Sequence, residues 1–509
     1  MSLATVFSRA QTGMDAPLVT VEVDLSNGLP GLSIVGLPEA AVKESKDRVR
    51  AALLNSGYDF PARRITVNLA PADLPKEGGR FDLPIALGIL AASKQITKDS
   101  LIPYEFIGEL SLSGKLRAVH GVLPAAVASG KQNRAIIVPL ENGSEALLAT
   151  QTTVFAINNL LELSAHLSQQ EPLTPHKNQI DQIQTVEILD IEDVRGQHRA
   201  RRALEVAAAG SHNMLMVGSP GSGKTMLASR LPSILPPLNE SEAVESATVY
   251  SISHGGFSNE QWGVRPFRAP HHTASGVALV GGGSNPMPGE ISLAHHGVLF
   301  LDELTEFDRH VLEVLREPLE TGNIAISRAA KQVQFPARFQ LIAAMNPCPQ
   351  GCDIDVNGNC ACTPEQIRRY RGRISAPLLD RIDIHIDVPR VPKELLKQHT
   401  PNNGENNNSE KSKDVQLRVC ATREVQIKRQ QKSNAHMTNK EIEKYCQLNN
   451  ECDTLMDKAF EQLGLSARGY HRTLKLARTI ADLEVSENIE TNHLSEAISY
   501  RQYDRLLNK

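Results

Sequence analysis

Short apolar runs, each followed by turn or polar residues, recur through the middle of the chain. Residues 213–217, 297–301 and 339–345 are mostly apolar and lead into glycine-rich, acidic and Asn-Pro segments. Runs of this length predict buried strands of a parallel sheet. From Ile382 to position 388, isoleucine alternates with polar residues, which predicts one more, half-buried strand.

Helices and linkers complete this pattern. Helices are predicted over residues 199–209, 226–231 and 474–483. Two polar stretches without apolar periodicity predict a linker at 168–187 and a disordered loop at 396–414. The chain is therefore expected to form three parts, which are an N-terminal domain (1–167), a central α/β domain (188–395) and a C-terminal helical domain (415–509).

Composition excludes several classes of protein. The 509 residues carry a formal net charge of only −4, so nucleic-acid binding would have to use local basic surfaces. No apolar stretch is long enough to cross a bilayer, and the first residues lack the charged start and apolar core of a signal peptide. Seven cysteines, an odd number, do not form a secreted disulfide framework. We expect a cytoplasmic protein without membrane contact.

A phosphate-binding loop follows the strand at 213–217. It fits the pattern G-x-x-x-x-G-K-[ST] and consists of Gly218, Ser219, Pro220, Gly221, Ser222, Gly223, Lys224 and Thr225. The glycines let backbone N–H groups surround a phosphate, and the following helix adds its N-terminal partial charge. Lys224 would reach the β- and γ-phosphates and Thr225 would hold Mg²⁺. This segment, the P-loop, predicts binding of a nucleoside triphosphate.

Polar residues after the next two strands supply the groups that hydrolysis needs. Asp302 ends the strand at 297–301 and can hold Mg²⁺ through water, while Glu303 can polarise the attacking water. Asn346 follows the strand at 339–345 and can orient water against the γ-phosphate. Upstream, Val194 and its neighbouring backbone could lie against the adenine.

Arg381 stands just before the last predicted strand. An arginine there can project onto the γ-phosphate bound by a neighbouring subunit, as an arginine finger in trans. An ion pair with Asp380 or Asp383 is the alternative, and the sequence does not separate the two.

Four cysteines are crowded into 15 residues after Asn346. Cys348, Cys352, Cys360 and Cys362 have the spacing C-x₃-C-x₇-C-x-C, with turn residues between them. Four thiolates in a reducing compartment fit a closed, tetrahedral structural Zn²⁺ site, and four reduced surface thiols are the alternative. Arginines 368, 369, 371 and 373 follow as a basic strip that could extend a DNA or subunit surface.

Two further segments could contact DNA. Residues 262–296 are rich in Gly, Pro and His, and residues 324–335 predict a β-hairpin with Arg328 and Lys331 beside its tip. Two cations on a hairpin suit a phosphate backbone, although a solvated tip is the usual fate of such residues. The pairs His271-His272 and His295-His296 are not expected to bind metal, because adjacent side chains point apart and no third ligand is spaced around them.

The ordered set of motifs resembles an AAA+ ATPase of the magnesium-chelatase-like branch. Over nearly its full length the chain is similar to the ComM/YifB competence family, through the segments 265–273, 288–295 and 468–472. This resemblance implies an ATP-driven, homohexameric DNA motor for branch migration in recombination and natural transformation. It also implies that Arg468 acts as sensor 2 on a helical lid, binding the γ-phosphate as ATP closes the lid, with Arg472 as the alternative.

The N-terminal domain resembles the α+β fold of Lon-protease and ribosomal S5-type domains, through residues 69–86 and 106–116. Arg80 occupies the position of the nucleophilic serine in that family, and Leu123 that of its lysine, so no acyl chemistry is expected. The domain is predicted to be a scaffold or a DNA-binding accessory. Candidates for a basic face are Arg48, Arg50, Arg63, Arg64, Lys76 and Arg80.

Two functions compete for these features. The first is an ATPase that moves along branched or single-stranded DNA. The second is a chelatase-type ATPase that remodels a partner protein for metal insertion without touching DNA. The N-terminal domain, the cysteine cluster and the cationic hairpin favour the DNA motor, because a chelatase ATPase subunit is expected to resemble the central domain alone.

Overall fold

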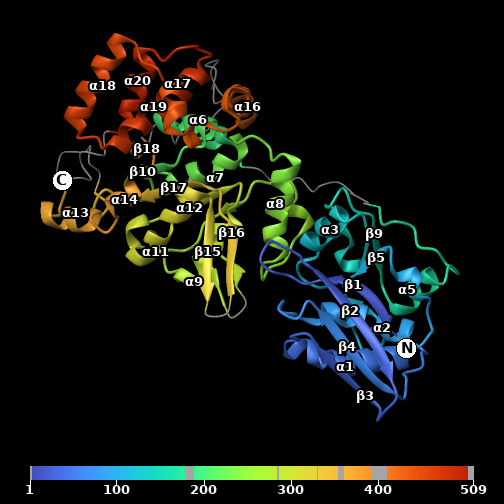
Figure 1. Cartoon of the computed structure of the whole chain (residues 1–509). Helices are drawn as coiled ribbons and strands as arrows, with labels where there is room; N and C mark the ends of the chain where they lie inside the picture. Colours follow the sequence, from blue (N-terminus) through green and yellow to red (C-terminus); the bar gives the residue numbers. More distant parts are fainter. Residues whose placement is uncertain are drawn as a thin grey trace, which may run out of the picture.

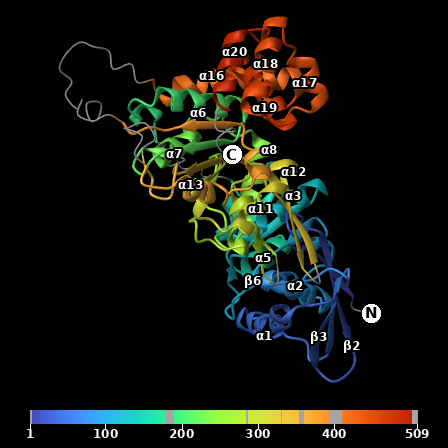
Figure 2. The ribbon, with the colours of Figure 1, turned by 90° about the vertical axis from the view of Figure 1, so that its left-hand side faces the viewer.

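Two sheets and a helical bundle follow one another along the molecule, with the N-terminal sheet at one end and the C-terminal helices at the other (Figures 1 and 2). The computed structural model describes residues 3–177, 189–283, 286–328, 331–352, 360–391 and 410–501. Half of the predicted linker (178–187) and most of the predicted loop (396–409) lie outside these residues. The last residues of that loop are helical, because α16 begins at Ser412.

A seven-stranded mixed sheet forms the N-terminal part, in the order β3-β4-β2-β1-β5-β8-β9. The strands are β1 (Ala4–Arg9), β2 (Leu18–Ser26), β3 (Gly31–Val35), β4 (Arg64–Ala70), β5 (Tyr104–Phe106), β8 (Ala135–Pro139) and β9 (Val154–Ile157). Its helices are α1 (Ala40–Asn55), α2 (Asp82–Ala92), α3 (Val122–Lys131), α4 (Gly143–Ala146) and α5 (Leu160–Leu167), and a short pair of strands is β6 (Glu109–Leu110) and β7 (Leu116–Arg117). Strand β2 alternates buried and half-buried residues, whereas every residue of α2 is buried, so α2 is the centre of this core.

A five-stranded parallel sheet forms the centre, in the order β11-β14-β17-β10-β18. Its strands are β10 (Met214–Val217), β11 (Phe267–Arg268), β14 (Val298–Leu301), β17 (Gln340–Met345) and β18 (Ile384–Asp387). Strands β10, β14 and β17 are buried throughout, as expected of a parallel sheet covered on both faces. The four predicted strands and the predicted α/β class are thereby confirmed. The predicted half-burial of the last strand is wrong, because Ile384, His385 and Ile386 of β18 are all buried.

Helices and small hairpins surround this sheet. The helices are α6 (His198–Gly210), α7 (Lys224–Ile234), α8 (Glu240–Ser251), α9 (Gly276–Val280), α10 (Glu290–Leu293), α11 (Arg309–Val314), α12 (Arg316–Thr321), α13 (Pro364–Arg371) and α14 (Ala376–Leu379). The hairpins are β12 (Gly281–Gly282) with β13 (Met287–Pro288), and β15 (Asn323–Arg328) with β16 (Lys331–Pro336). The predicted hairpin at 324–335 and the helices at 199–209 and 226–231 are confirmed.

Five helices close the C-terminal end: α16 (Ser412–Gln430), α17 (Asn439–Tyr445), α18 (Asn450–Leu463), α19 (Ala467–Leu483) and α20 (Thr491–Ser499). Their apolar side chains share one core with α6, α7 and the face of β10 that carries Met214 and Met216. The bundle therefore packs directly on the central sheet, above α6 and α7 (Figure 1). Within the described residues, every helix is too short or too polar to span a bilayer.

Candidate nucleotide-binding site

The P-loop joins β10 to α7 at the carboxyl ends of the central strands. Gly221 and Gly223 have φ angles of +78° and +94°, which glycine adopts readily, and a Cβ on either would meet nothing within 4 Å. A Cβ on Gly218, by contrast, would come 2.3 Å from the Val388 carbonyl oxygen. The loop thus has open space around Gly221 and Gly223, whereas Gly218 leaves no room for a side chain. Helix α7 begins at Lys224, so the unpaired N–H groups of its first turn end at this cradle.

The Lys224 ammonium lies folded over the loop. Only 8 % of Lys224 is exposed, and its Nζ donates to the carbonyl oxygens of Gly218 (2.7 Å) and Ser219 (3.0 Å) and to Asn346 Oδ1 (3.3 Å). Burial lowers the pKa of Lys224, while the carboxylates of Asp302 and Glu303 oppose this shift. The strand ends therefore bring Asn346 to the P-loop lysine, as parallel pairing of β10 with β17 requires.

Two oxygen ligands suited to Mg²⁺ meet beside the loop. Thr225 Oγ1 donates to Asp302 Oδ2 at 2.7 Å, and Asp302 Oδ1 accepts the backbone N–H of Glu303 at 2.9 Å. Hydroxyl and carboxylate oxygens are the hard ligands that Mg²⁺ prefers, and the ion keeps several waters as well. The residues present therefore fit a Mg²⁺-bound triphosphate, with Thr225 and Asp302 holding the ion and the P-loop holding the phosphates.

Glu303 contacts a histidine that the sequence did not connect with it. His272 Nδ1 lies 3.2 Å from Glu303 Oε2, and both side chains are partly exposed. Glu303 has a φ of +51°, a region that non-glycine residues seldom enter. His272 follows β11, which pairs with β14, so the contact links the segment at 262–296 to the residue predicted to polarise water.

Two further side chains support the P-loop from distant parts of the chain. Gln197 Nε2 donates to the Ser222 carbonyl at 3.3 Å and to the Pro389 carbonyl at 2.6 Å. Arg390 Nε donates to Ser219 Oγ at 3.1 Å. Neither residue was predicted as a P-loop contact, because neither side chain has a local sequence pattern that marks it.

Val194 lies in the core beside α6 and α7. Its side chain is only 3 % exposed and packs with α6, α7 and the C-terminal helices. Contact of Val194 or its neighbouring backbone with adenine stays a prediction.

Arg381 lies at the amino ends of the central strands, opposite the ends that carry the P-loop. Strand β18 is parallel to β10, and the N–H groups of Asp383 and Ile384 bond the carbonyl of Asn213, immediately before β10 begins. The P-loop follows the opposite end of β10. At about 3.3 Å per residue, a four-residue strand separates the two edges by at least ~10 Å. We call the P-loop side the nucleotide edge, and the side with Arg381, Arg468 and Arg472 the arginine edge.

The Arg381 guanidinium is held within its own subunit. Its side chain is 6 % exposed, forms an ion pair with Glu320 of α12, and donates from Nη1 to the Pro377 carbonyl at 2.5 Å. The remaining Nε has no acceptor among the described residues. The pair with Asp380 or Asp383 that the sequence left open is therefore wrong, because Arg381 pairs with a residue 61 positions away.

Arg472 and Arg468, one helical turn apart on α19, are placed very differently. Arg472 donates to the Arg381 carbonyl at 3.1 Å and pairs with Asp383. Burial would raise the pKa of Asp383, but Arg472 and His212 hold it far below its usual range. Arg468 is exposed and makes no hydrogen bond or ion pair within the described part of the chain. Arg472 is thus part of a buried ion cluster, whereas Arg468 is accessible at the arginine edge.

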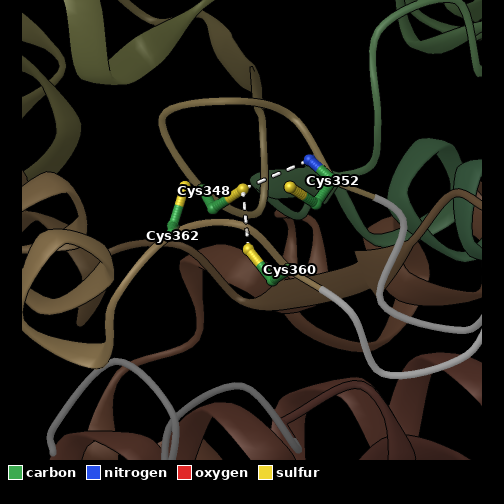
Figure 3. Close-up of side chains that lie close together, drawn as sticks. All are labelled: Cys348, Cys352, Cys360 and Cys362. Carbon is green, nitrogen blue, oxygen red and sulfur yellow. Dashed lines mark hydrogen bonds between the residues drawn. The ribbon is translucent and has the colours of Figure 1, made fainter.

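The four cysteines come together, as Figure 3 shows. All four are unpaired thiols, and their Sγ atoms lie within 4.8 Å of one another. The Sγ atoms of Cys348 and Cys360 are 3.6 Å apart, and the Cys352 N–H donates to Cys348 Sγ at 3.2 Å. Of the basic strip that follows, Arg371 donates to the Pro347 carbonyl and Arg373 to the Thr305 carbonyl, so only Arg368 and Arg369 remain available for a ligand surface.

The second histidine pair has a third partner, contrary to the prediction. The rings of His295 and His296 lie 3.9 Å apart, and the Nε2 atoms of both face Glu245 Oε2, at 3.2 and 2.8 Å. However, His295 Nδ1 accepts the N–H of Arg338 at 3.0 Å, which places the ring proton on Nε2 toward the carboxylate. Burial lowers the pKa of His295 to about 4, and the bond from His295 lowers the pKa of Glu245 to about 2. The cluster therefore joins α8 to the segment before β14 by hydrogen bonds, and the expectation that these histidines bind no metal stays a prediction.

Two of the six residues of the predicted basic face of the N-terminal domain are buried, and a third is only partly exposed. Lys76 is completely buried and donates to the Pro71 carbonyl, and Arg48 pairs with Asp82. Arg80 is 5 % exposed and donates to the carbonyls of Arg9, His120 and Gly121. Burial lowers the pKa of Arg80 to about 10. Arg80 is thus a buried cation whose guanidinium donates to backbone oxygens. Leu123 is likewise a buried core residue.

The β15–β16 hairpin places its two terminal cations in register. Arg328 pairs with Lys331 at the last position of the ladder, and positions 329–330 at the tip lie outside the described residues. Ile324, Ile326, Val333 and Phe335 are buried against the central domain. The base of the hairpin is therefore anchored, and its end carries two basic residues at one place.

Comparison with known proteins gives matches along the whole chain. The models for Magnesium chelatase, subunit ChlI, for Subunit ChlI of Mg-chelatase, and for Magnesium chelatase, subunit ChlI C-terminal match residues 190–396, 21–142 and 409–501. Competence protein ComM of Haemophilus influenzae is 52% identical over 514 residues, which cover 100% of this chain and 99% of that protein. YifB of Escherichia coli is 50% identical over 508 residues, with 100% and 98% covered. An uncharacterized protein of Mycobacterium tuberculosis is 38% identical over 510 residues, with 99% of each chain covered.

Proposed function

Because this chain belongs to the ComM/YifB family of magnesium-chelatase-like AAA+ proteins, we propose that it is an ATP-driven, hexameric motor acting on branched or single-stranded DNA. Its cytoplasmic role would be branch migration in recombination and in the uptake of DNA. The family implies ATP and Mg²⁺ as cofactors. The name of the Haemophilus relative, a competence protein, supports the second part of this role.

One observation carries the proposal of a ring. The groups for binding and hydrolysis gather at the nucleotide edge, while Arg381 stands at the arginine edge of the same sheet. Since Arg381 is on the wrong side of its own sheet, it can reach a γ-phosphate only in a neighbouring subunit. Arg468 is exposed at this edge too, so we propose that both arginines serve the neighbour's ATP. This replaces the expectation that Arg468 closes over ATP with its own lid.

Within one subunit, each residue of the nucleotide edge has a defined task. Lys224 would leave the loop carbonyls for the β- and γ-phosphates, while Thr225 and Asp302 hold Mg²⁺. Bound Mg²⁺ supplies charge neutralisation on the phosphates. Glu303 accepts the proton of the attacking water, and Asn346 orients that water. The four cysteines would hold a structural Zn²⁺ in a closed tetrahedral site.

Contact with DNA is proposed for the β15–β16 hairpin. Its anchored base and the register of Arg328 with Lys331 put two cations at its end. A cation that neutralises a phosphate of single-stranded DNA releases counterions, so each contributes about −0.7 to the salt slope of binding. Removing both should therefore make the slope less negative by roughly 1.4.

The test is ATPase turnover against a panel of DNA forms. We expect single-stranded, forked and four-way junction DNA to raise the rate strongly at about 100 mM salt, and added salt to reduce this effect. The double variant Arg328→Ala/Lys331→Ala should lose the stimulation but keep the DNA-free rate. Lys440→Ala/Lys458→Ala removes an equal charge from exposed residues of the C-terminal helices and is the matched control. If no DNA form binds or stimulates, the motor proposal is wrong.

A chelatase-type ATPase remains the second candidate, because all three matching models describe a magnesium-chelatase subunit. One of them covers residues 21–142, so the N-terminal domain does not separate the two functions as the sequence analysis expected. For this candidate a partner protein, and not DNA, would stimulate turnover. The same panel therefore distinguishes the two.

A further inference from the structure

The cysteine cluster shares its backbone with the nucleotide site. Cys348 comes two residues after Asn346, whose side chain accepts the Lys224 ammonium. Gly351 lies between the first two cysteines with a φ of +66°, and a Cβ placed on it would come 2.5 Å from Pro220 Cδ. The turn between Cys348 and Cys352 therefore packs directly on the tip of the P-loop.

The sulfur atoms have the spacing of a tetrahedral metal site. With metal–sulfur bonds of about 2.3 Å, the edges of a tetrahedron of thiolates are roughly 3.8 Å long. The Cys348–Cys360 distance of 3.6 Å and the limit of 4.8 Å for all pairs agree with this geometry. The N–H of Cys352 on Cys348 Sγ adds a hydrogen bond that favours a thiolate there.

Helix α13 follows the last cysteine of the cluster and contacts the segment that carries Asn346. Cys362 directly precedes Thr363, which caps α13 with a capping box. At the far end of the helix, Arg371 donates from Nε and Nη2 to the Pro347 carbonyl, both at 3.2 Å. The segment that carries Asn346 is thus held by the cluster through Cys348 and by α13 through Pro347.

We propose that zinc bound by the four cysteines is a positioning element of the ATP site. The ion would fix the turn at Gly351 against Pro220 and hold Asn346 beside Lys224, so that the affinity for ATP depends on bound zinc. This inference rests on the zinc site proposed above and adds a role for it in nucleotide binding.

The first test removes the ion. Cys360→Ser takes away one ligand, and Cys420→Ser removes a half-buried thiol of α16 that is outside the cluster. Zinc content is measured by elemental analysis, and affinity with a fluorescent ATP analogue in the presence of Mg²⁺. We expect one zinc per chain in the wild type and in Cys420→Ser. In Cys360→Ser we expect loss of zinc and at least a ~10-fold loss of affinity.

The second test keeps the ion and breaks the contact. Gly351→Ala leaves all four ligands but forces a methyl group against Pro220. Gly464→Ala, at a similar φ of +63° with nothing within 4 Å, imposes the same backbone strain away from the site. Gly351→Ala should retain zinc and a thermal transition close to that of Gly464→Ala, yet bind the analogue about 5-fold more weakly than this control.

The outcomes separate the two claims. Wild-type protein without zinc overturns both the zinc site and the inference. Zinc in the wild type, together with normal affinity in zinc-free Cys360→Ser, overturns the positioning role and leaves the zinc site standing. If Cys360→Ser does not fold, Gly351→Ala decides, and unchanged affinity in that variant overturns the inference.

Discussion

The two edges of the central sheet use their charged groups in different ways. At the nucleotide edge, Lys224 donates to P-loop carbonyls and to Asn346, and Thr225 donates to Asp302. An incoming phosphate or Mg²⁺ can replace these contacts. At the arginine edge, Arg381 and Arg472 are tied to Glu320 and Asp383. The nucleotide edge is therefore organised to bind a ligand. At the arginine edge, a new partner would have to replace an existing ion pair.

If Arg381 serves the neighbouring subunit as an arginine finger, the nucleotide edge of one subunit can bind ATP without it. An arginine held by a carboxylate of its own subunit must give up that pair before it binds a phosphate. Assembly of the ring would supply the replacement partner. Hydrolysis would then depend on assembly, whereas nucleotide binding would depend on the nucleotide edge alone.

The largest effect is expected from Lys224→Ala. The variant loses the ammonium that we propose binds the β- and γ-phosphates, so ATP binding and turnover should become undetectable. Glu303→Gln keeps the cradle and should bind ATP without hydrolysing it. Filter binding of labelled ATP and phosphate release measure the two steps. Rapid hydrolysis by Glu303→Gln would remove Glu303 from the catalytic role.

The next effect separates the two arginines of α19. Arg472→Ala leaves the buried Asp383 carboxylate without its main partner, which should cost about 3 kcal/mol in the free energy of unfolding. Arg468→Ala removes an exposed side chain and should change that free energy by less than about 0.5 kcal/mol. Turnover should nevertheless fall in Arg468→Ala. Urea denaturation of both variants, followed by ATPase assays, checks this, and equal stabilities would contradict the division.

A smaller effect is expected at His272. While its Nδ1 holds the Glu303 carboxylate, that oxygen is not available to the attacking water. An exposed contact of this kind is worth at most about 1 kcal/mol, so His272→Ala should raise the DNA-free ATPase rate by up to about 5-fold. His271→Ala is the matched control, since His271 Nδ1 contacts Thr273 and not Glu303. A fall in rate would show instead that His272 helps to orient Glu303.

The smallest effect concerns the loss of folding stability at acidic pH. Burial lowers the pKa of His212 at the arginine edge and of His295 behind β14, the latter to about 4. Because His295 protonates near pH 6.5 in the unfolded chain while its ring stays neutral in the fold, stability should fall as pH decreases below 6.5. His295 alone should contribute about 1 kcal/mol between pH 7.5 and pH 5.5. Urea denaturation at the two pH values measures this, and His295→Asn should reduce the difference.

The nucleotide edge could be predicted because its signals are local. Each strand, its polar ending and the P-loop lie within a few residues of one another, and parallel pairing brings Asn346 to Lys224. The contacts that the sequence did not predict join distant positions, such as Arg381 with Glu320, Glu245 with His295 and Gln197 with Pro389. Their partners are chosen by packing of whole elements, which no local pattern records. For the same reason Arg80 and Lys76 were expected on a surface and lie in a core.

The mixing of two defective subunits tests the shared site most directly. Arg381→Ala keeps a complete nucleotide edge, and Glu303→Gln keeps a complete arginine edge. Loss of an arginine finger should lower turnover on the order of 10³-fold, and each variant alone should be nearly inactive. If the finger acts between subunits, mixed rings contain some complete sites, and the mixture should hydrolyse ATP faster than either variant. A mixture whose rate equals the weighted mean of the two would contradict the account.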